Sequence, residues 1–324
     1  MLILSRADLE RVLDPAAVII AVEAAFSEAA AGRAPALPRA VLPMAKGGVF
    51  VGMISALPRR QALGAKLVTV VEANRKRGLP TLHASYLLSD PETGAPLAFM
   101  EAGFLTAIRT GAASAVAAKY LARPGSRRVA CFGAGVQAEF QLRCLKAALP
   151  VESVAVVGRD PTRAWAFAAR MRGALGVPVE VTPDRRAAVR EADVVTCATT
   201  SSRPVFAGRD LRPGAHVDAI GAFRPDTREV DTETVKRARV VVDTYHGAWA
   251  EAGDLLMPIT AGAITRRHVK AELAEVVAHK KPGRTRPDEI TLFKSVGWAP
   301  EDAAAARLAY DRAMAQGIGT EVTL

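Results

Sequence analysis

Apolar residues recur along the middle of the chain in short runs that alternate with helical patterns. A run at 129–132 leads into a glycine turn, a helical pattern at 137–149 and a second run at 154–157. Strand, glycine turn, helix and strand in this order form the βαβ unit that holds dinucleotides. Later runs also alternate with helical patterns, which indicates a parallel, doubly wound sheet. These strands are expected at 177–181, 194–200, 216–221 and 239–243.

The first hundred residues follow a different pattern. Asp14 is an N-cap acceptor and Pro15 a first-turn proline, so they begin a helix, which Gly32 ends. Its apolar stripe is Val18, Ile19, Val22 and Phe26. A hairpin turn at 90–94 joins two predicted strands. With strands expected at 50–54, 67–71, 85–88 and 96–100, this segment forms an α+β module.

Two domains are expected, because 324 residues suit more than one small core. A helix of small residues at 105–121 leads from the α+β module into the dinucleotide-binding part, and a last helix at 302–314 is expected to return to the module. The prediction is an α/β protein with a Rossmann-type, doubly wound sheet at 114–301. Residues 1–113, completed by 302–324, form the α+β domain.

The glycine turn predicts a cofactor site. Gly133 lets the chain turn sharply off the strand, and Gly135 lets the backbone approach a pyrophosphate. The helix that follows offers free N–H groups and a positive dipole end to the phosphates. Ala138 is the third small residue, where close packing of helix on strand is needed. Since the turn lies between a strand and a helix, a binding role is favoured over a merely structural one.

The end of the second strand selects the cofactor. An NAD enzyme usually has an acidic residue there, which accepts hydrogen bonds from the ribose. This chain has Gly158 followed by Arg159, whose guanidinium can bind a 2′-phosphate bidentately. NADPH is therefore the expected cofactor, with NADH as a second one. The alternative is that Arg159 is solvated and that Asp160 binds the ribose.

The formal net charge of +10 does not by itself indicate nucleic-acid binding. The arginines are scattered over many elements, and no basic block is interleaved with aromatic residues. Solvated arginines are the simpler interpretation, and no nucleic-acid partner is expected. A basic surface still favours anionic ligands such as NADPH and carboxylates.

Cysteine usage indicates a reducing compartment. Cys131, Cys144 and Cys197 form no CxxC pair, and two of them lie in predicted buried elements. The histidines are dispersed, so no metal site is expected. Asp8 and Glu10 come too early for a signal peptide, and no apolar run is long enough to cross a bilayer. We expect a cytoplasmic protein without a membrane partner.

Several stretches carry distinctive motifs in a consistent order. They are AKLVT at 65–69, IRTGAAS at 108–114, GAGVQA at 133–138, IGA at 220–222 and ITLFKSVG at 290–297. Together they resemble the ornithine cyclodeaminase/μ-crystallin family, from about Leu37 to the C-terminus. The resemblance implies a homodimer, an N-terminal domain for substrate binding and dimerisation, and a central Rossmann domain. It also implies an amino-acid or imino-acid substrate that is held by its carboxylate.

The resemblance further implies which residues form the site. The carboxylate-binding set is Arg39, Lys66 and Arg109, of which Lys66 and Arg109 are the expected catalytic residues. The cofactor contacts are Thr81, Arg109, Thr110, Gly133, Gly135, Val136, Gln137, Arg159, Asp160, Thr199, Ile220 and Lys294. Ser295 and Val296, with Lys294, form the lip of the cleft and contact the substrate.

The residues agree with this carboxylate-binding set. Charge-assisted hydrogen bonds to a buried carboxylate contribute roughly 1.5–3 kcal/mol each. Lys66 lies in an apolar strand, where a lysine needs an anionic partner. Two alternatives stay open: Arg39 is a surface arginine, or Arg109 forms a structural ion pair.

One departure from the family decides the expected activity. Cyclodeaminases carry an aspartate shortly after the strand glycine, and it acts as the base. This chain reads GAFRPD at 221–226, with Phe223 at the position of the acid. Losing a general base typically costs about 10²–10⁴-fold in rate. Ornithine cyclodeamination is therefore not expected, and Asp226 could replace the base only if the loop shifted.

The same loop resembles the branch of the family that reduces cyclic ketimines, the Δ1-pyrroline-2-carboxylate reductases of hydroxyproline breakdown. A cyclic imine can enter already protonated, so the protein supplies orientation and charge, and Phe223 an apolar wall. The predicted reaction is NAD(P)H-dependent reduction of Δ1-pyrroline-2-carboxylate to L-proline, and also of Δ1-piperideine-2-carboxylate to L-pipecolate. Two alternatives are an open-chain, alanine-type amino-acid dehydrogenase or reductive aminase and a non-catalytic, NADPH-binding protein of the crystallin kind.

Overall fold

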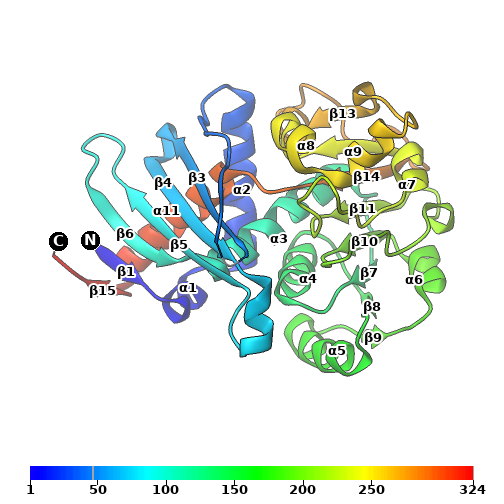
Figure 1. Cartoon of the computed structure of the whole chain (residues 1–324), viewed down its shortest axis with the longest axis horizontal. Helices are drawn as coiled ribbons and strands as arrows, with labels where there is room; N and C mark the ends of the chain where they lie inside the picture. Colours follow the sequence, from blue (N-terminus) through cyan, green and yellow to red (C-terminus); the bar gives the residue numbers. More distant parts are fainter. Residues whose placement is uncertain (46, 324) are drawn as a thin grey trace. The chain divides into compact units, whose positions relative to one another are not determined.

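The computed structural model describes residues 1–45 and 47–323, and the chain divides into two compact units (Figure 1). One unit consists of Met1–Arg109 and Ala299–Leu324, and the other of Thr110–Trp298. The first boundary falls inside helix α3 (Ala102–Leu121), and the second falls at the start of helix α11 (Ala299–Gln316).

A mixed sheet is the framework of the first unit, with strand order β15-β1-β6-β5-β4-β3-β2. β1 runs parallel to β6, and the other neighbouring strands are antiparallel. The strands are β1 (Leu2–Leu4), β2 (Ala40–Pro43), β3 (Val49–Leu57), β4 (Ala62–Val70), β5 (Leu82–Ser89), β6 (Pro96–Glu101) and β15 (Thr320–Glu321). The helical segments are α1 (Arg6–Val12), α2 (Pro15–Ala30), the 3₁₀ turns η1 (Pro58–Arg60) and η2 (Glu72–Arg77), and α11.

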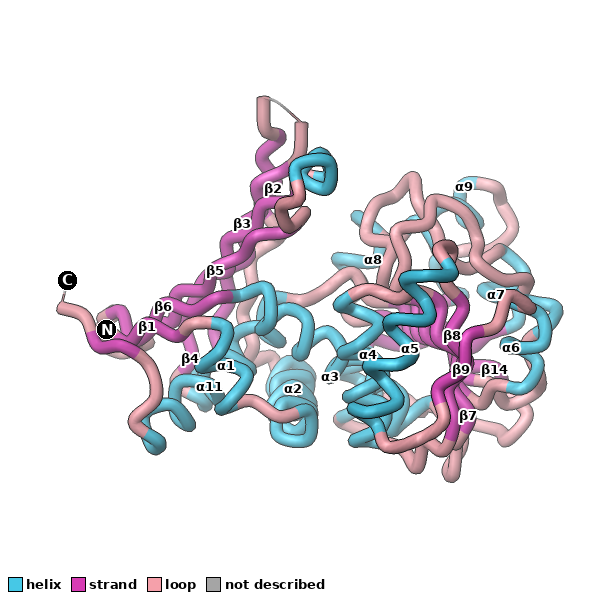
Figure 2. Tube along the Cα trace, turned by 90° about the horizontal axis from the view of Figure 1, so that it is seen from below, coloured by secondary structure: helices cyan, strands magenta, loops and turns pink. Residues whose placement is uncertain are grey.

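The predicted helices of this unit are confirmed. The Asp14 side chain accepts a hydrogen bond from Ala17 N at 2.9 Å, and Pro15 is the first residue of α2. α11 packs on α2 and lies against β3, β4, β5 and β6. Figure 2 shows the helices on one side of this sheet. The C-terminal helix therefore completes the first unit because its apolar stripe closes the core over the sheet.

A parallel sheet forms the second unit, in the order β13-β12-β14-β11-β10-β7-β8-β9. Its strands are β7 (Arg128–Phe132), β8 (Ser153–Val157), β9 (Val179–Val181), β10 (Val194–Cys197), β11 (His216–Ala219), β12 (Ala238–Val242), β13 (Val269–Glu272) and β14 (Ile290–Lys294). Its helical segments after α3 are α4 (Val136–Ala148), α5 (Pro161–Leu175), α6 (Arg185–Glu191), η3 (Gly208–Asp210), α7 (Thr232–Arg237), α8 (Tyr245–Glu251), α9 (Gly253–Thr260), η4 (Arg266–His268) and α10 (Leu273–Val277).

Alternate residues of β7 show that this sheet is covered on both faces. Val129 and Cys131 belong to the apolar cluster that includes α4 and α5. Ala130 and Phe132 belong to the cluster on the opposite face, which includes residues of α6 and α7. The doubly wound sheet predicted from the sequence is therefore confirmed, and the buried strands read as continuous apolar runs for this reason.

The main errors of the sequence-based prediction concern short strands. β1, β2, β13 and β15 were not expected, and β14 was noted only as a motif. β10 and β11 also end earlier than expected, at Cys197 and Ala219. Short strands carry too few residues for a period of two to stand out, and their hydrogen-bonding partners lie far away in sequence.

Candidate active site

The glycine turn after β7 has the geometry that a dinucleotide phosphate needs. Gly133 has φ +119°, and a Cβ there would lie 2.4 Å from the Ala198 carbonyl oxygen, so only glycine fits. At Gly135 a Cβ would meet nothing within 4 Å, which leaves room beside the backbone. Gly135 is the N-cap of α4 and makes no side-chain capping bond. The first N–H groups of the helix are therefore available to an anion.

The start of α4 also carries an unsatisfied acceptor. Val136 is 56% exposed. The buried Gln137 Oε1 has no hydrogen-bond partner among the described residues. A ribose hydroxyl can donate to such an oxygen, so the residues present fit a dinucleotide.

The end of β8 has no room for an acidic side chain. A Cβ on Gly158 would lie 2.8 Å from Ala164 Cβ, because α5 begins close to the strand. Asp160 is the N-cap of α5, and its side chain accepts from Arg163 N at 3.2 Å. Arg159 is exposed and forms no ion pair with the described part of the chain. At the end of β8, the Asp160 carboxylate is therefore already engaged as a helix cap, and the Arg159 guanidinium is the charged group that remains available to a ligand.

The carboxyl ends of β7, β10, β11 and β14 lie level with one another. Phe132 is in register with Cys197, Cys197 with Ala219, and Ala219 with Lys294. The strand order reverses between β7 and β10, and open α/β sheets bind ligands in the crevice outside such a point. Thr199 follows β10, and Ile220 follows β11, so the fold brings both to this edge.

The segment after β14 is held by buried acids that the sequence analysis missed. Lys294 is fully buried, and its ammonium lies 2.7 Å from Asp254 Oδ2. Asp243 Oδ2 accepts from Ser295 Oγ at 2.9 Å and from Val296 N at 2.7 Å. Both Lys294 and Ser295 therefore have internal partners. The conformation of the segment is fixed by Asp243 and Asp254.

The loop after β11 contains Phe223 and Asp226, the two residues on which the expected activity depends. Phe223 is 44% exposed, so its ring is free to pack against a small molecule. Asp226 is exposed as well, and Arg224 binds both of its oxygens, at 3.0 and 2.6 Å. The hydrogen bond from Arg224 lowers the pKa of Asp226. A solvated carboxylate that is held by arginine is a poor base, so Asp226 does not replace the missing acid.

In the first unit, Lys66 and Arg109 meet two carboxylates at the start of α11. Lys66 Nζ lies 2.8 Å from Asp302, and Arg109 Nε donates to the same carboxylate at 2.9 Å. Arg109 Nη1 donates to Glu301 Oε2 at 2.6 Å. All four side chains are buried. The sequence predicted that Lys66 needs an anionic partner, and Asp302 is such a partner. The structural ion pair that was the alternative role for Arg109 is also present, with Glu301 and Asp302.

Asp302 and Glu301 are functional candidates that the sequence analysis missed. Their signal was an acidic pair in the first turn of an alanine-rich helix, but nothing in the sequence alone tied this pair to strand β4. Only the packing of α11 on the sheet brings residues that are 236 positions apart within 2.8 Å.

Charge and burial compete at this cluster. Burial is the largest effect on Lys66, and with the neighbouring charge of Arg109 it lowers the pKa of Lys66 to about 8, although Asp302 opposes both. Burial also lowers the pKa of Arg109, but Asp302 and Glu301 outweigh it and raise that pKa. The charge of Arg39 acts on Lys66 as well. Lys66, Arg109 and Arg39 therefore bring three positive charges to this cluster, and Asp302 and Glu301 bring two negative charges.

The other predicted contacts lie in both units. The Thr110 carbonyl accepts from Gln141 Nε2 at 3.3 Å, so it ties α3 to α4. Thr81 precedes β5, and its carbonyl accepts from Val71 N at 2.8 Å. Each residue has a structural bond of its own, and a contact with the cofactor stays a prediction for both.

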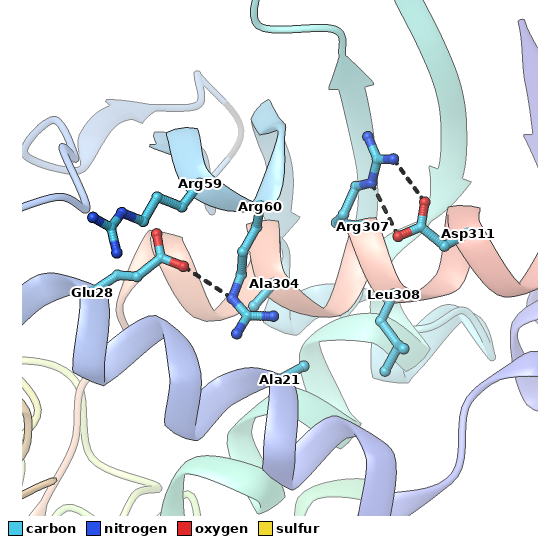
Figure 3. Close-up of a pocket in the computed structure, with 8 residues that line it drawn as sticks. All are labelled: Ala21, Glu28, Arg59, Arg60, Ala304, Arg307, Leu308 and Asp311. Carbon is cyan, nitrogen blue, oxygen red and sulfur yellow. Dashed lines mark hydrogen bonds and ion pairs between the residues drawn. The ribbon is translucent and has the colours of Figure 1, made fainter.

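A hollow of about 420 Å³ on the first unit does not coincide with the cluster around Lys66 (Figure 3). It is lined by Ala21, Glu28, Arg59, Arg60, Ala304, Arg307, Leu308 and Asp311. Two of the arginines are already paired across or along it, Arg60 with Glu28 and Arg307 with Asp311. None of the predicted site residues lines this hollow.

Two findings concern metal binding and membrane insertion. Within residues 1–45 and 47–323, the His, Cys, Asp and Glu side chains form no group of three that could hold a metal ion. No helix in this part of the chain combines the length and the apolar character that crossing a membrane requires.

The parallel sheet, its switch point and the open helix terminus after Gly135 define a dinucleotide-binding protein of the Rossmann type. The comparison with known families makes this class more specific, because the match extends over residues 1–317 and so includes the first unit. The chain belongs to the ornithine cyclodeaminase/mu-crystallin family.

Relatives and solved structures narrow the class further. The chain is 37% identical to a Δ1-pyrroline-2-carboxylate reductase of Bacillus cereus, over 99% of each protein. It is 44% identical to the Δ1-pyrroline-2-carboxylate reductase of Thermococcus litoralis in complex with NADH and L-proline, with a TM-score of 0.97 over 99% of this chain and 100% of the other. An archaeal alanine dehydrogenase dimer with bound NAD is 35% identical, with a TM-score of 0.94 over 100% and 99%.

Proposed function

We propose that this protein is an NAD(P)H-dependent reductase of cyclic ketimine carboxylates, which converts Δ1-pyrroline-2-carboxylate to L-proline. The observation that carries the proposal is the full-length similarity to a reductase whose structure holds NADH and L-proline. The acid expected of a cyclodeaminase is replaced by Phe223, which supports the same conclusion.

The chain's part in the reaction is to bind and orient the substrate. Arg39, Lys66 and Arg109 hold the carboxylate through charge-assisted hydrogen bonds. Phe223 provides an apolar wall for the ring. The bound dinucleotide supplies a hydride to the imine carbon. Because the ring nitrogen enters protonated, no side chain has to remove a proton in that step.

The test is steady-state oxidation of NADPH and NADH with each of the two cyclic imines, the five-membered Δ1-pyrroline-2-carboxylate and the six-membered Δ1-piperideine-2-carboxylate. Turnover of the five-membered imine is expected, with the six-membered one as a second substrate. If neither imine is reduced with either cofactor, the proposed function is wrong.

An alanine-type dehydrogenase is the second candidate, since the chain is also 35% identical to an alanine dehydrogenase over its full length. This candidate predicts turnover of pyruvate with ammonia at a rate at least equal to that of the imines. Cyclic imine reduction predicts little activity with pyruvate and ammonia. One plate of assays with both substrate types separates the two functions.

We further propose that NADPH is preferred. The support is that Arg159 is exposed and forms no ion pair within residues 1–45 and 47–323, and that it follows Gly158, where a side chain has no space. Arg159→Ala should weaken NADPH binding by about 10-fold or more, since charge-assisted bonds contribute roughly 1.5–3 kcal/mol, and should leave NADH binding nearly unchanged. Binding is measured by fluorescence titration, and equal losses for both cofactors would contradict the preference.

We propose that the protein is a homodimer that pairs through the open face of the first unit's sheet. The helices lie on one side of this sheet (Figure 2), and large apolar side chains that share a face in the strand register are exposed. They include Ile54 at 45% exposed, Leu67 at 43%, Leu87 at 38% and Phe99 at 42%. A contiguous apolar surface of this kind is typical of an interface between subunits. One of the similar structures is a dimer.

Two finer expectations stay predictions. The cysteines Cys131, Cys144 and Cys197 are free and buried, which is consistent with the cytoplasm. That hydroxyproline breakdown supplies the imine follows only from the resemblance of the loop at Phe223.

A further inference from the structure

A buried carboxylate joins the two loops that follow β10 and β11. Glu229 has no exposed surface. Its Oε1 accepts from Thr199 N at 2.6 Å and from Thr199 Oγ1 at 2.7 Å. Its Oε2 accepts from Gly221 N at 2.6 Å and from Ala222 N at 3.2 Å. One oxygen therefore binds the first loop, and the other oxygen binds the second.

The backbone at Glu229 is held in place by a second buried carboxylate, that of Asp254. Asp254 Oδ1 accepts from Glu229 N at 2.7 Å and from Val230 N at 2.9 Å. The other oxygen of Asp254 pairs with Lys294, whose ammonium also donates to the Ala222 carbonyl. The last residue of β14 thus completes a closed network around the ends of the three strands.

The loops after β10 and β11 approach each other so closely that no residue other than glycine fits at position 221. A Cβ on Gly221 would lie 2.3 Å from the Thr199 carbonyl oxygen and 2.5 Å from Glu229 Oε1.

All four groups that bind Glu229 are donors, so both of its oxygens must be acceptors. A carboxylate meets this requirement, whereas an amide would present its own NH₂ to one pair of donors.

Stability alone is a weak reason for such a network. Glu229, Asp254 and Lys294 bury two negative charges and one positive charge, and their desolvation costs free energy that apolar side chains of similar size would not. What the network does provide is a fixed geometry of two loops at the edge where open α/β sheets bind their ligands.

We propose that Glu229 is a positioning residue. It fixes the loops at Thr199 and Ile220 in the conformation that supports the nicotinamide end of the dinucleotide. This inference rests on the proposed function for the identity of the cofactor. Glu229 acts through the backbone of the two loops and does not contact the reacting atoms.

The experiment compares Glu229→Gln with Glu233→Gln, the same substitution at an exposed position four residues later. Dissociation constants of NADH and NADPH are measured by fluorescence titration, which needs no turnover. For Glu229→Gln both should rise about 10-fold or more, the loss expected when charge-assisted bonds that hold a binding loop are removed. Glu233→Gln should match the unaltered protein.

Kinetics with the cyclic imine separate positioning from a general loss of structure. In Glu229→Gln, kcat should fall about 100-fold because the nicotinamide ring is then misplaced relative to the imine carbon. The primary isotope effect with cofactor deuterated at the transferring position should rise, and the KM of the imine should change less than the KM of the cofactor. A purely structural role would lower the active fraction and leave both KM values and the isotope effect unchanged, which would overturn the proposal.

Thr199→Val provides a second variant in case Glu229→Gln does not fold. It removes the hydrogen bond that Thr199 Oγ1 donates to Glu229 Oε1 and the one that Oγ1 accepts from Ser201 N, and it keeps the backbone donor of Thr199. Cofactor binding weakened by several-fold in Thr199→Val supports the proposal, and unchanged binding contradicts it. If the unaltered protein reduces no imine, the proposed function fails, while the binding constants still decide the role of Glu229.

Discussion

The charge on Lys66 depends on Asp302, and this dependence can be tested. Lys66 is 1% exposed, and its ammonium lies 2.8 Å from Asp302. Burial and the charge of Arg109 lower the pKa of Lys66 to about 8, against the opposing effect of Asp302. The protonated form, which can bind a carboxylate, is therefore present below pH 8 and is lost above it.

Asp302→Asn removes the carboxylate and nearly preserves the shape of the side chain. For unit charges 2.8 Å apart, Coulomb's law with an effective dielectric constant of about 20 gives about 6 kcal/mol. One pKa unit corresponds to about 1.4 kcal/mol, so losing even a quarter of that energy lowers the pKa of Lys66 by about one unit or more. In the variant, Lys66 should be mostly neutral at pH 7.5.

The assay is the inhibition constant of cyclopentanecarboxylate, whose own carboxyl group is ionised throughout the range from pH 6 to pH 9. In the unaltered protein the inhibition constant should be flat at low pH and should rise above about pH 8. In Asp302→Asn the rise should begin at least one pH unit lower. At pH 7.5 binding should be about 10-fold weaker, in line with the loss of one charge-assisted bond.

Asp311→Asn is the matched control, because Asp311 lies on the same helix, is half exposed and pairs with Arg307 instead. It should show the profile of the unaltered protein. Superimposable pH profiles for Asp302→Asn and Asp311→Asn would refute the reasoning that Asp302 maintains the charge of Lys66. Breaking a buried pair also costs about 3–5 kcal/mol of stability, so the free energy of unfolding of each variant should be measured in urea.

Two further predictions concern the glycine turn after β7 and the open face of the first unit's sheet. Gly133→Ala forces a side chain to φ +119°, which costs about 1–3 kcal/mol before any overlap with Ala198 is counted, and should abolish NADPH binding. Its control, Gly173→Ala in α5, has open space at the Cβ and should be neutral or more stable in urea denaturation. Phe99→Glu, on the open face of the first unit's sheet, should give a monomer in light scattering at micromolar concentration. Ile20→Glu, on α2 and with a larger exposed fraction of 67%, should leave the dimer intact, and a dimer that survives Phe99→Glu places the interface elsewhere.

The local pattern of the sequence determined most of the dinucleotide-binding unit. Its strands are buried on both faces and are apolar throughout, its helices begin at Asp160 and Asp184 as N-caps, and Gly133 stands where only glycine fits. Such features act over a few residues, so they are visible in the chain itself. The replacement of an acid by Phe223 is also a property of the sequence alone.

Which buried charges meet depends on how distant elements pack together. Lys66 and Asp302 lie on β4 and α11, and Glu229, Asp254 and Lys294 are gathered from a loop, a helix and a strand. A sequence pattern shows that a buried charge needs a partner, but it does not say which one. That choice is made by the packing of helices on the two sheets, because a charge can be buried only where a distant element supplies the opposite charge within hydrogen-bonding distance.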